Sequence, residues 1–490
     1  MEYGYGIDLG TTNSCIARAT KKGVVEIIKN CEGDDLTPSV VEFSEANILV
    51  GNAAKESARI NRANVIENIK SHMGRDDFYY TFNETKFTPV DISTEILKKL
   101  VYDAEQEVHD KIKDVIITVP AYFSDPAKHD TIEAAKKAGL NVIELIYEPS
   151  AAALAYSNKY EGMIGKTVLV YDLGGGTFDV TLAKIVDVND VQVLHRDGNC
   201  HLGGKHWDAD LEKYVISELC DKTNATEDDI SRNLPFYNKI GIEVEEAKKR
   251  LSRMGCEKTP IYLNWNGKDV QIDISRTKFD EITRGRLLST IDLTKKVFDL
   301  ARNEPGCANK AYNELVDEII LVGGSTKMKQ VSEELYNTVG IKPVIFEQNL
   351  AVAKGAALFA TGSCNIAEVA NKSFGVSALN SDDELILCNI IKKGTKTPCS
   401  ISDTYYTAYD GQDCISPTIY ENESKEDTHR LNAADVREIE RFTLQLPYGV
   451  RAGSPIKVTI SIDRGGILKL VAEEMTTHTK CEIKAEINRN

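Results

Sequence analysis

One feature of this sequence limits its possible folds more than any other: an apolar segment followed by Asp-Leu-Gly occurs twice. The first copy, YGIDLGTTN, ends at Asn13, and the second, VLVYDLGGGTFD, occupies 168–179. A third apolar segment followed by glycines, IILVGGST, occupies 319–326. Duplicated units of this kind predict two related lobes that face one another.

The wider pattern predicts an α/β fold for the first part of the chain. Short apolar runs alternate with longer helical patterns through roughly the first 360 residues, as in domains built from alternating strands and helices. The runs at 115–119, 142–146 and 167–171 predict strands, and residues 130–138 predict a helix. At 490 residues the chain is too long for one compact core, so we expect two or three domains.

The pattern changes after Gly362. Residues 363–372 are short and polar and predict a linker, placed at 363–370, although the end of a surface helix would have the same composition. Helical periodicity then largely disappears, and we expect an α/β domain over 1–362 and an all-β module over 371–490. Strands are predicted at 385–391, 404–409, 418–420, 442–446, 456–462 and 467–472, with turn signals at 393–394, 410–411 and 464–466.

Charge and composition exclude several classes of function. The formal net charge of −16 argues against nucleic acid or an anionic membrane as a partner, because those surfaces are bound mainly through Lys and Arg. No apolar run approaches the ~20 residues that span a bilayer, and the N-terminus MEYGYGIDLG has no basic leader. With 42% hydrophobic and 27% charged residues, we expect a folded, cytoplasmic protein.

The cysteines give no sign of a disulfide framework or a metal site. Eleven of them are scattered from Cys15 to Cys481, without a CxxC pair and without a histidine at metal-ligand spacing. We therefore expect reduced and mostly buried thiols.

The repeated turns predict a phosphate site. A strand that ends in Asp and continues into Gly and small hydroxyl residues forms a tight hairpin whose backbone amides can approach a phosphate. A single Asp-Leu-Gly is most often ordinary turn chemistry. Two copies, at 8–13 and 172–177, predict two hairpins that hold a polyphosphate from both sides. Carboxylates there need a divalent cation, so Asp8 and Asp172 are candidate sites for Mg²⁺ held largely through waters.

The third turn has two interpretations. Gly323 and Gly324 follow an apolar strand and would let the adenosine part of a ligand approach closely, but an ordinary strand-to-helix turn has the same pattern. No segment matches the Walker A pattern G-x-x-x-x-G-K-[ST], which excludes that class of nucleotide site.

At seven places the sequence resembles the seventy-kilodalton heat-shock chaperones, in order and in spacing. The matching segments are IDLGTTNS (7–14), VPAYFSD (119–125), EPSAAALAY (148–156), DLGGGTFDV (172–180), HLGGKHWD (201–208), EEAKKRLS (245–252) and LVGGST (321–326). The similarity is strong over 1–362, looser over 371–490, and closest to the shorter bacterial DnaK-like paralogues. It implies a two-lobed ATPase domain of actin-like fold, a β-sandwich peptide-binding domain and slow ATP hydrolysis.

The resemblance also implies roles for individual residues. Lys70, which composition alone would place on the surface, would reach the γ-phosphate and help to orient the attacking water. The implied catalytic residues are Lys70, Thr11, Glu148, Asp172 and Asp179, and the implied Mg²⁺ site comprises Asp8, Asp172 and Glu148, with K⁺ as a further candidate ion. ATP would contact Gly10, Thr11, Thr12, Asn13, Gly174, Gly175, Gly176, Thr177, Gly203, Gly204, Glu245, Lys248, Lys249, Ser252, Gly323, Gly324, Ser325 and Lys327.

The segment at 245–252 places its functional candidates at helical spacing. Glu245, Lys248, Lys249 and Ser252 fall at i, i+3, i+4 and i+7, and therefore on one face of a helix. By resemblance this face lines the adenosine, whereas a solvated charged face is the ordinary alternative. Lys327 stands where the family usually has arginine, so a stacked guanidinium is replaced by a point charge and weaker adenine affinity is expected.

Other departures from the family affect regulation. Asn349-Leu350 replaces an Asp-Glu pair near the adenosine, and Cys200 replaces a threonine, which puts self-phosphorylation there in doubt. Lys128 replaces an arginine associated with relay of the nucleotide signal, whereas Pro120 is retained. The linker segment NIAEV offers only Ile366 and Val369 as apolar anchors, so we expect weaker docking on the nucleotide domain.

By resemblance, the β-module binds extended hydrophobic peptides through backbone hydrogen bonds and one apolar pocket. The candidate pocket residues, each of which would serve equally well in a sandwich core, are Val376, Leu379, Tyr405, Ala408 and Ile415. The chain ends at Asn490 without the helical lid of the family, so peptide exchange is expected to be fast. A J-domain co-chaperone and a nucleotide exchange factor are the implied partners.

Three functions remain in competition. The first is an ATP-driven chaperone that cycles between loose and tight peptide states. The second is a relative of sugar or metabolite kinases, which the C-terminal module disfavours. The third is a nucleotide-gated scaffold for one dedicated partner, which is compatible with the altered linker and the missing lid.

Overall fold

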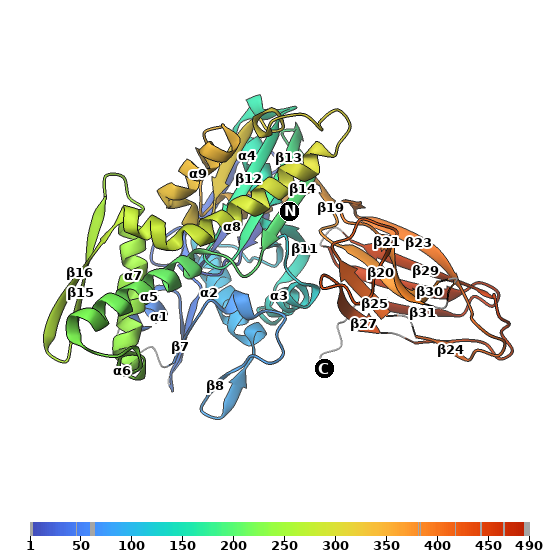
Figure 1. The fold of residues 1–490 in the computed structure, drawn as a ribbon, viewed down its shortest axis with the longest axis horizontal. Helices are drawn as coiled ribbons and strands as arrows, with labels where there is room; N and C mark the ends of the chain where they lie inside the picture. The colour runs from blue at the N-terminus through green and yellow to red at the C-terminus, as the bar shows by residue number, and fades with distance from the viewer. Residues whose placement is uncertain are drawn as a thin grey trace.

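The computed structural model describes residues 3–45, 47–58, 64–380, 382, 384–416, 418–441, 443–463 and 466–484. Phe442, the first two residues of the turn predicted at 464–466, and the end of the module at 485–490 lie outside these ranges. Figure 1 shows a mixed α/β part beside a β-rich part, coloured orange to red, that the C-terminal strands form. No helix in the described residues is long and apolar enough to cross a membrane.

The first lobe is built on a six-stranded sheet. Its order is β11 (Asn141–Tyr147), β10 (Asp114–Val119), β1 (Tyr3–Asp8), β2 (Asn13–Thr20) and β3 (Val25–Ile28), with β4 (Thr37–Pro38) beside β2. Buried side chains of α2 (Pro89–Val108) and α3 (Asp125–Lys137) pack on one face. The lobe is extended by α1 (Asn52–Ala58), η1 (Ile69–His72), the sheet β6 (Ile48–Val50), β5 (Val40–Phe43), β7 (Val65–Glu67) and the hairpin β8 (Tyr80–Phe82), β9 (Thr85–Phe87).

The second lobe is built on a seven-stranded sheet. Its order is β18 (Val344–Ile345), β17 (Glu318–Val322), β12 (Thr167–Leu173), β13 (Phe178–Asp187), β14 (Asp190–Asn199), β19 (Asn365–Val369) and β22 (Lys396–Thr397). The outer core is completed by α5 (Gly204–Thr223), α6 (Glu227–Arg232), α7 (Leu234–Leu251), α8 (Arg276–Arg302), α9 (Lys329–Val339) and the hairpin β15 (Lys258–Trp265), β16 (Lys268–Ser275). Three 3-10 turns, η2 (Glu161–Met163), η3 (Tyr312–Glu314) and η4 (Gly324–Lys327), complete this part of the chain.

Two helices of small residues join the lobes. The buried faces of α4 (Glu148–Lys159) and α10 (Ala351–Ala360) share one apolar core with residues of both large sheets. The contact is close: a Cβ on Gly355 of α10 would lie 1.8 Å from the carbonyl oxygen of Ala151 in α4, and one on Gly6 of β1 would lie 2.1 Å from the amide nitrogen of Ala357. Because only glycine leaves room for this approach, the sequence fixes how near the lobes stand.

The β-rich part encloses a separate core. One sheet has the order β26 (Thr428–His429), β21 (Leu385–Ile391), β20 (Ser373–Leu379), β25 (Thr418–Asn422), β27 (Arg437–Arg441), and the other β23 (Cys399–Tyr406), β29 (Pro455–Ile462), β30 (Leu468–Glu474), β31 (Lys480–Lys484). Alternate residues of β29 and β30 point inward, as the pleat requires, and meet Phe374, Val376 and Ile391 between the sheets. A short pair, β24 (Cys414–Ile415) with β28 (Leu444–Gln445), lies at one end.

The predicted elements differ from the structure mainly at their ends. The strands predicted at 115–119, 142–146 and 167–171 are confirmed as β10, β11 and β12. The helix predicted from residue 130 begins earlier, because Ser124 caps α3 and Pro126 lies in its first turn. The strand predicted at 404–409 ends at Tyr406, because the backbone of Thr407 turns to hydrogen-bond with Ser454 and Gly453.

The expectation of mostly buried thiols was wrong. All eleven cysteines are free, but only Cys15 is buried, Cys31 is exposed and the other nine are half-buried. The reason is their position, since several of them, such as Cys200, Cys256 and Cys307, lie in turns between elements rather than on inward-facing positions.

The contact between α4 and α10 yields a stability prediction with a matched control. Gly355→Ala adds one methyl group where a carbonyl oxygen already stands, and we expect it to lower the free energy of unfolding by about 1 to 3 kcal/mol. Gly285→Ala, also within a helix but with nothing near its Cβ position, should be neutral or stabilise by up to about 1 kcal/mol. Urea unfolding of both variants measures this difference. Equal transition midpoints for the two variants would show that α4 and α10 can move apart without a cost in stability.

Candidate functional site

A cavity of about 890 Å³ lies between the two lobes. The hairpin after β1 and η1 of the first lobe form one side, and the hairpin after β12, the turn after β17 and the face of α7 form the other. The predicted residues that line it are Asp8, Gly10, Thr11, Thr12, Asn13, Lys70, Glu148, Asp172, Gly174, Gly175, Thr177, Glu245, Lys248, Lys249, Ser252, Gly323, Gly324, Ser325 and Lys327. Residues from distant parts of the sequence therefore share one site.

The two hairpins touch one another. A Cβ on Gly175 would lie 2.0 Å from Oγ1 of Thr12, and one on Gly176 would lie 2.8 Å from Cγ2 of Thr11, so neither glycine has room for a side chain. The hydroxyl of Ser39 donates to the carbonyl of Gly10 at 2.8 Å and fixes the first hairpin. Thr11 and Thr12 of the first lobe therefore lie directly against the glycines of the second hairpin.

The third turn and the start of α5 fix the second hairpin. Ser325 Oγ donates to the carbonyl of Gly174 at 2.9 Å, and the amide of Gly204 donates to the same oxygen at 3.0 Å. Gly323 has a φ of 82°, and a Cβ there would lie 2.5 Å from Oδ1 of Asp172. A left-handed backbone this close to a carboxylate requires glycine.

Carboxyl groups gather at the bottom of the cavity around a single lysine. Lys70, which is only 5% exposed, forms an ion pair with Glu148 at the first residue of α4. Asp8 ends β1, whereas Asp172 and Asp179 lie opposite one another on β12 and β13. Glu148, Asp172 and Asp179 are buried, so four acids share one ammonium group in a region of low dielectric.

This crowding raises the pKa of the three aspartates, Asp8, Asp172 and Asp179. Burial, with the negative charge of Glu148, raises the pKa of Asp8 to about 7 and that of Asp179 to about 8. Burial and the charges of Glu148, Asp179 and Asp8 raise the pKa of Asp172 well above its usual range. Lys70 opposes these shifts without cancelling them. Such a donor set suits a hard divalent cation, because carboxylate oxygens are its preferred ligands.

The opposite end of the cavity carries paired charges on α7. Lys249 bridges Glu245 at 2.9 Å, and Lys248 bridges Asp208 of α5 at 2.6 Å. Ser252, at the end of α7, donates to the carbonyl of Lys248. This face lines the cavity, and the side chains of Glu245 and Lys249 also keep contact with solvent.

Four predicted residues lie one layer behind the cavity wall: Gly176, Asp179, Gly203 and Gly204. A Cβ on Gly203 would lie 2.6 Å from the backbone of Gly176, so these two glycines let α5 approach the second hairpin. Asp179 accepts a hydrogen bond from the amide of Ala121 at 3.1 Å. They shape the site through backbone packing and charge.

Sequence reasoning missed Ser39, Lys205 and Asp208, which also line the cavity. Two of them follow Gly204 in the segment HLGGKHWD, where polar residues directly after a glycine pair at a helix start were the available signal. Ser39 carried no signal, because its role depends on pairing with a hairpin far away in sequence.

The predicted linker forms a strand. β19 pairs in parallel with β14, and its two apolar anchors, Ile366 and Val369, are buried. Glu368 is also buried and lies 3.0 Å from Arg196 Nη1. Arg196 donates to the carbonyl of Val369 as well and stacks over the ring of Tyr147. Counting apolar anchors alone therefore underestimated the contacts that hold this segment.

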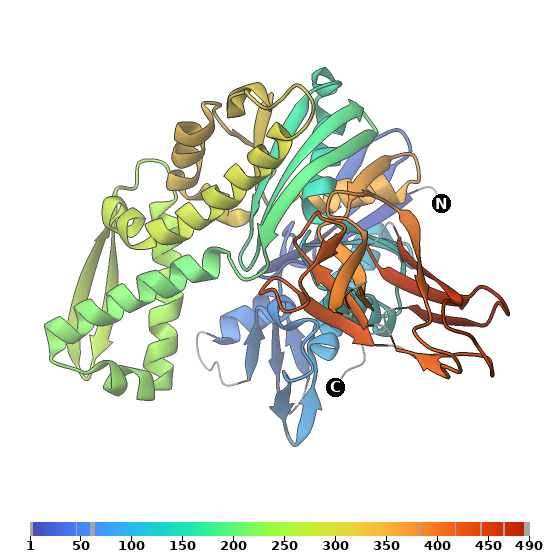
Figure 2. The same cartoon turned by 45° about the vertical axis from the view of Figure 1, so that its right-hand side comes forward.

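The β-rich part touches the first lobe near α3. Asn371 donates to the carbonyl of Ala121 at 3.0 Å, and the buried Lys128 donates to the carbonyl of Gly466 at 2.9 Å. Figures 1 and 2 both place the β-rich part beside α3. Lys128, singled out above as a departure from the family, thus bridges the two parts of the chain.

The five candidate peptide residues have different environments. Val376 is fully packed in the core between the sheets. Tyr405 and Ile415 are half-buried against that core, whereas Leu379 and Ala408 are exposed. Four of the five therefore keep an accessible surface.

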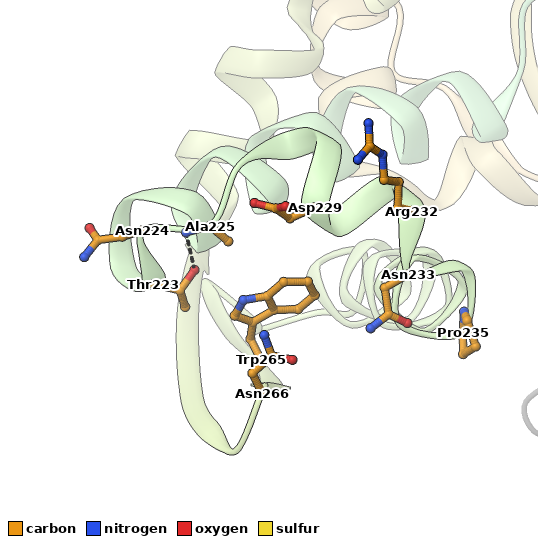
Figure 3. Close-up of a pocket in the computed structure, with 9 residues that line it drawn as sticks. All are labelled: Thr223, Asn224, Ala225, Asp229, Arg232, Asn233, Pro235, Trp265 and Asn266. Carbon is orange, nitrogen blue, oxygen red and sulfur yellow. Dashed lines mark hydrogen bonds between the residues drawn. The ribbon is translucent and has the colours of Figure 1, made fainter.

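A second pocket, of about 760 Å³, lies at the far tip of the second lobe (Figure 3). Its charged groups are already engaged, since Asp229 caps α6 and Arg232 pairs with Asp228 at 2.6 Å. The ring of Trp265 packs against that of Phe236 in a tilted arrangement, with ring centroids 4.9 Å apart. The two charged residues that line this pocket are therefore held by contacts within or beside α6.

The comparison with known families agrees with this geometry. The family model described as Hsp70 protein matches residues 5–490, and so nearly the whole chain. The match includes both hairpins, the third turn, the linker strand and the β-rich part. The chain therefore belongs to the Hsp70 family, whose members are ATP-binding chaperones that act in protein folding.

Proposed function

We propose that this protein hydrolyses ATP slowly in an actin-like nucleotide domain and uses the energy to bind and release extended hydrophobic segments of unfolded polypeptides. The observation that carries the proposal is the contact of the two glycine hairpins above a buried group of carboxyl groups. Members of the family are ATPases, and the two glycine hairpins, several acidic side chains and the buried Lys70 line the cavity together.

In this proposal the phosphates lie between the hairpins. Thr11 and Thr12 would present hydroxyl groups and amides to the phosphates, and Gly10 and Gly175 let the two hairpin backbones fold closely enough to hold them. Asp8, Asp172 and Glu148 would hold Mg²⁺, which when bound neutralises charge on the phosphates; K⁺ is a further candidate. The adenosine lies against Glu245, Lys248, Lys249, Ser252 and Lys327.

Lys70 has the central catalytic role. Its ammonium group is buried and already positioned by Glu148, so it can bind the γ-phosphate and orient the attacking water without reorganising. Phosphoryl transfer requires mainly positioning and neutralisation of charge, and no covalent intermediate is needed.

The linker strand couples the two activities. β19 is an integral strand of the second-lobe sheet, and the buried pair of Arg196 and Glu368 ties it to β14. A movement of the lobes therefore reaches the β-rich part through a paired strand. We include a J-domain co-chaperone and a nucleotide exchange factor as partners, because the family generally works with both. A cytoplasmic location is part of the proposal, supported by the eleven free thiols.

The first prediction concerns Lys70. Lys70→Ala removes the cation at the reacting phosphate, and single-turnover ATP hydrolysis should slow by about a hundredfold or more. The matched control is Lys113→Ala, which removes an exposed lysine from the same lobe and should leave the rate unchanged. Unaltered hydrolysis in Lys70→Ala would remove this residue from the mechanism.

The second prediction concerns pH. Because the folded-state pKa values of Asp8 and Asp179 are raised to about 7 and about 8, protons compete with the cation below that range. Binding of Mg²⁺-ADP should therefore tighten from about pH 6 to about pH 8, with proton release. Without metal, the folded form holds protons that the unfolded chain has lost, so the free energy of unfolding should fall as pH rises from about 4, where the unfolded aspartates titrate, to about 8.

Calorimetry in buffers of different ionisation enthalpy measures this proton release. Asp179→Asn keeps the acceptor for the Ala121 amide but cannot titrate, so the pH dependence should flatten. A wild-type profile identical to that of the variant would assign the titration to other groups.

The third prediction separates a chaperone from a dedicated scaffold. Several unrelated hydrophobic peptides should bind to the wild type, and ATP should accelerate their release by about tenfold, within the usual range of allosteric coupling. Fluorescent peptides and stopped-flow dissociation measure both properties. Binding of a single peptide only, or release unaffected by ATP, would favour the scaffold.

A variant of the linker contact tests the route of coupling. Arg196→Ala leaves Glu368 buried without its partner, a change that typically costs about 3 to 5 kcal/mol. The acceleration by ATP should be lost while peptide affinity without nucleotide is retained. Lys396→Ala, an exposed position on β22 beside the same strand, is the control.

A further inference from the structure

Lys205 lines the same cavity as Lys70. It lies in the first turn of α5, and its amide donates to the carbonyl of Gly175 at 2.9 Å. Its half-buried side chain crosses to the first lobe, where Nζ donates to Ser71 Oγ at 2.8 Å. Ser71 follows Lys70 on η1. The ammonium group therefore joins the two lobes beside the proposed catalytic lysine.

The pairing of Lys205 differs from that of its neighbours. Lys70, Lys248 and Lys249 each form an ion pair with a carboxylate. Among the described residues, the Lys205 ammonium group donates instead to a neutral hydroxyl group, that of Ser71. Burial lowers the pKa of Lys205, and the nearby thiol of Cys200 opposes this shift. A half-buried cation without a carboxylate is suited to an anionic ligand.

The surroundings of Ser71 indicate which part of a nucleotide that ligand would be. The hydroxyl oxygens of Ser71 and Thr11 lie 3.2 and 3.1 Å from the position that a Cβ of Gly176 would occupy. Lys205 therefore lies at the hairpins and at η1, which bears Lys70. The proposed adenosine end, at Lys248 and Lys249, is formed by a different element, α7. The end of the cavity near Lys205 is the phosphate end.

We propose that Lys205 binds the terminal phosphate of ATP from the second lobe, opposite Lys70, and that Ser71 holds its ammonium group when no nucleotide is present. This inference rests on the proposed ATP site. It adds a cation that recognises the third phosphate. ADP lacks that group, so Lys205 favours the triphosphate and draws the two lobes together around it.

The experiment compares the affinity for ADP with that for a non-hydrolysable ATP analogue, both with Mg²⁺, in the full-length protein. Lys205→Met should weaken binding of the triphosphate by about tenfold to a hundredfold, the value of one hydrogen bond between charged groups. ADP affinity should change by less than about twofold. Lys205→Arg keeps the charge and should restore most of the preference. Lys213→Met, an exposed position on the same helix, is the matched control.

Ser71→Ala distinguishes a phosphate-binding role of Lys205 from a purely structural hydrogen bond between the lobes. This variant removes the resting partner but keeps the ammonium group, so the preference for the triphosphate should persist. If Lys205 and Ser71 only hold the lobes together, both variants would weaken ADP and the triphosphate equally, and the proposal would be overturned. Unchanged binding in Lys205→Met would overturn it as well. A wild type that binds neither nucleotide would refute the ATP site itself, and this inference with it.

Discussion

The contact between α4 and α10 sets the geometry on which the site depends. Both helices present small residues. Because Gly355 has no side chain, the backbone of α10 can contact the carbonyl oxygen of Ala151 in α4. The two large sheets pack on this pair through one shared core. Because β1 and β12 end at the same side of that core, their hairpins meet, and Thr12 touches Gly175. A bulkier pair of helices would separate the hairpins and widen the proposed phosphate site.

The buried carboxyl groups of the site destabilise the folded state. Burying Asp8, Asp172 and Asp179 together opposes folding, because burial and the neighbouring negative charges disfavour their charged forms. The rest of the structure must offset this cost, as is usual where a site is organised for a ligand. The same strain favours binding of a cation with its nucleotide, since binding relieves the repulsion.

The sequence was most informative where function depends on local backbone. Glycines after apolar strands predicted all three turns, and their positions in one cavity agree with that prediction. Contacts between segments far apart in the sequence could not be predicted from local patterns. Examples are the hydrogen bonds from Ser39 to Gly10 and from Lys205 to Ser71, and the ion pair of Arg196 with Glu368. The linker shows why, because its apolar content predicted weak attachment, whereas strand pairing and a buried ion pair supply contacts that composition does not reveal.

The place of β19 in the second-lobe sheet has a consequence for solubility. In the docked arrangement β19 covers β14, and β22 covers β19 in turn. If the strand leaves, the backbone amides and carbonyls of β14 become an open sheet border, which is a template for pairing with another chain. If the proposed ATP-driven cycle detaches β19, that state would be prone to self-association unless it is short-lived or another polypeptide covers β14.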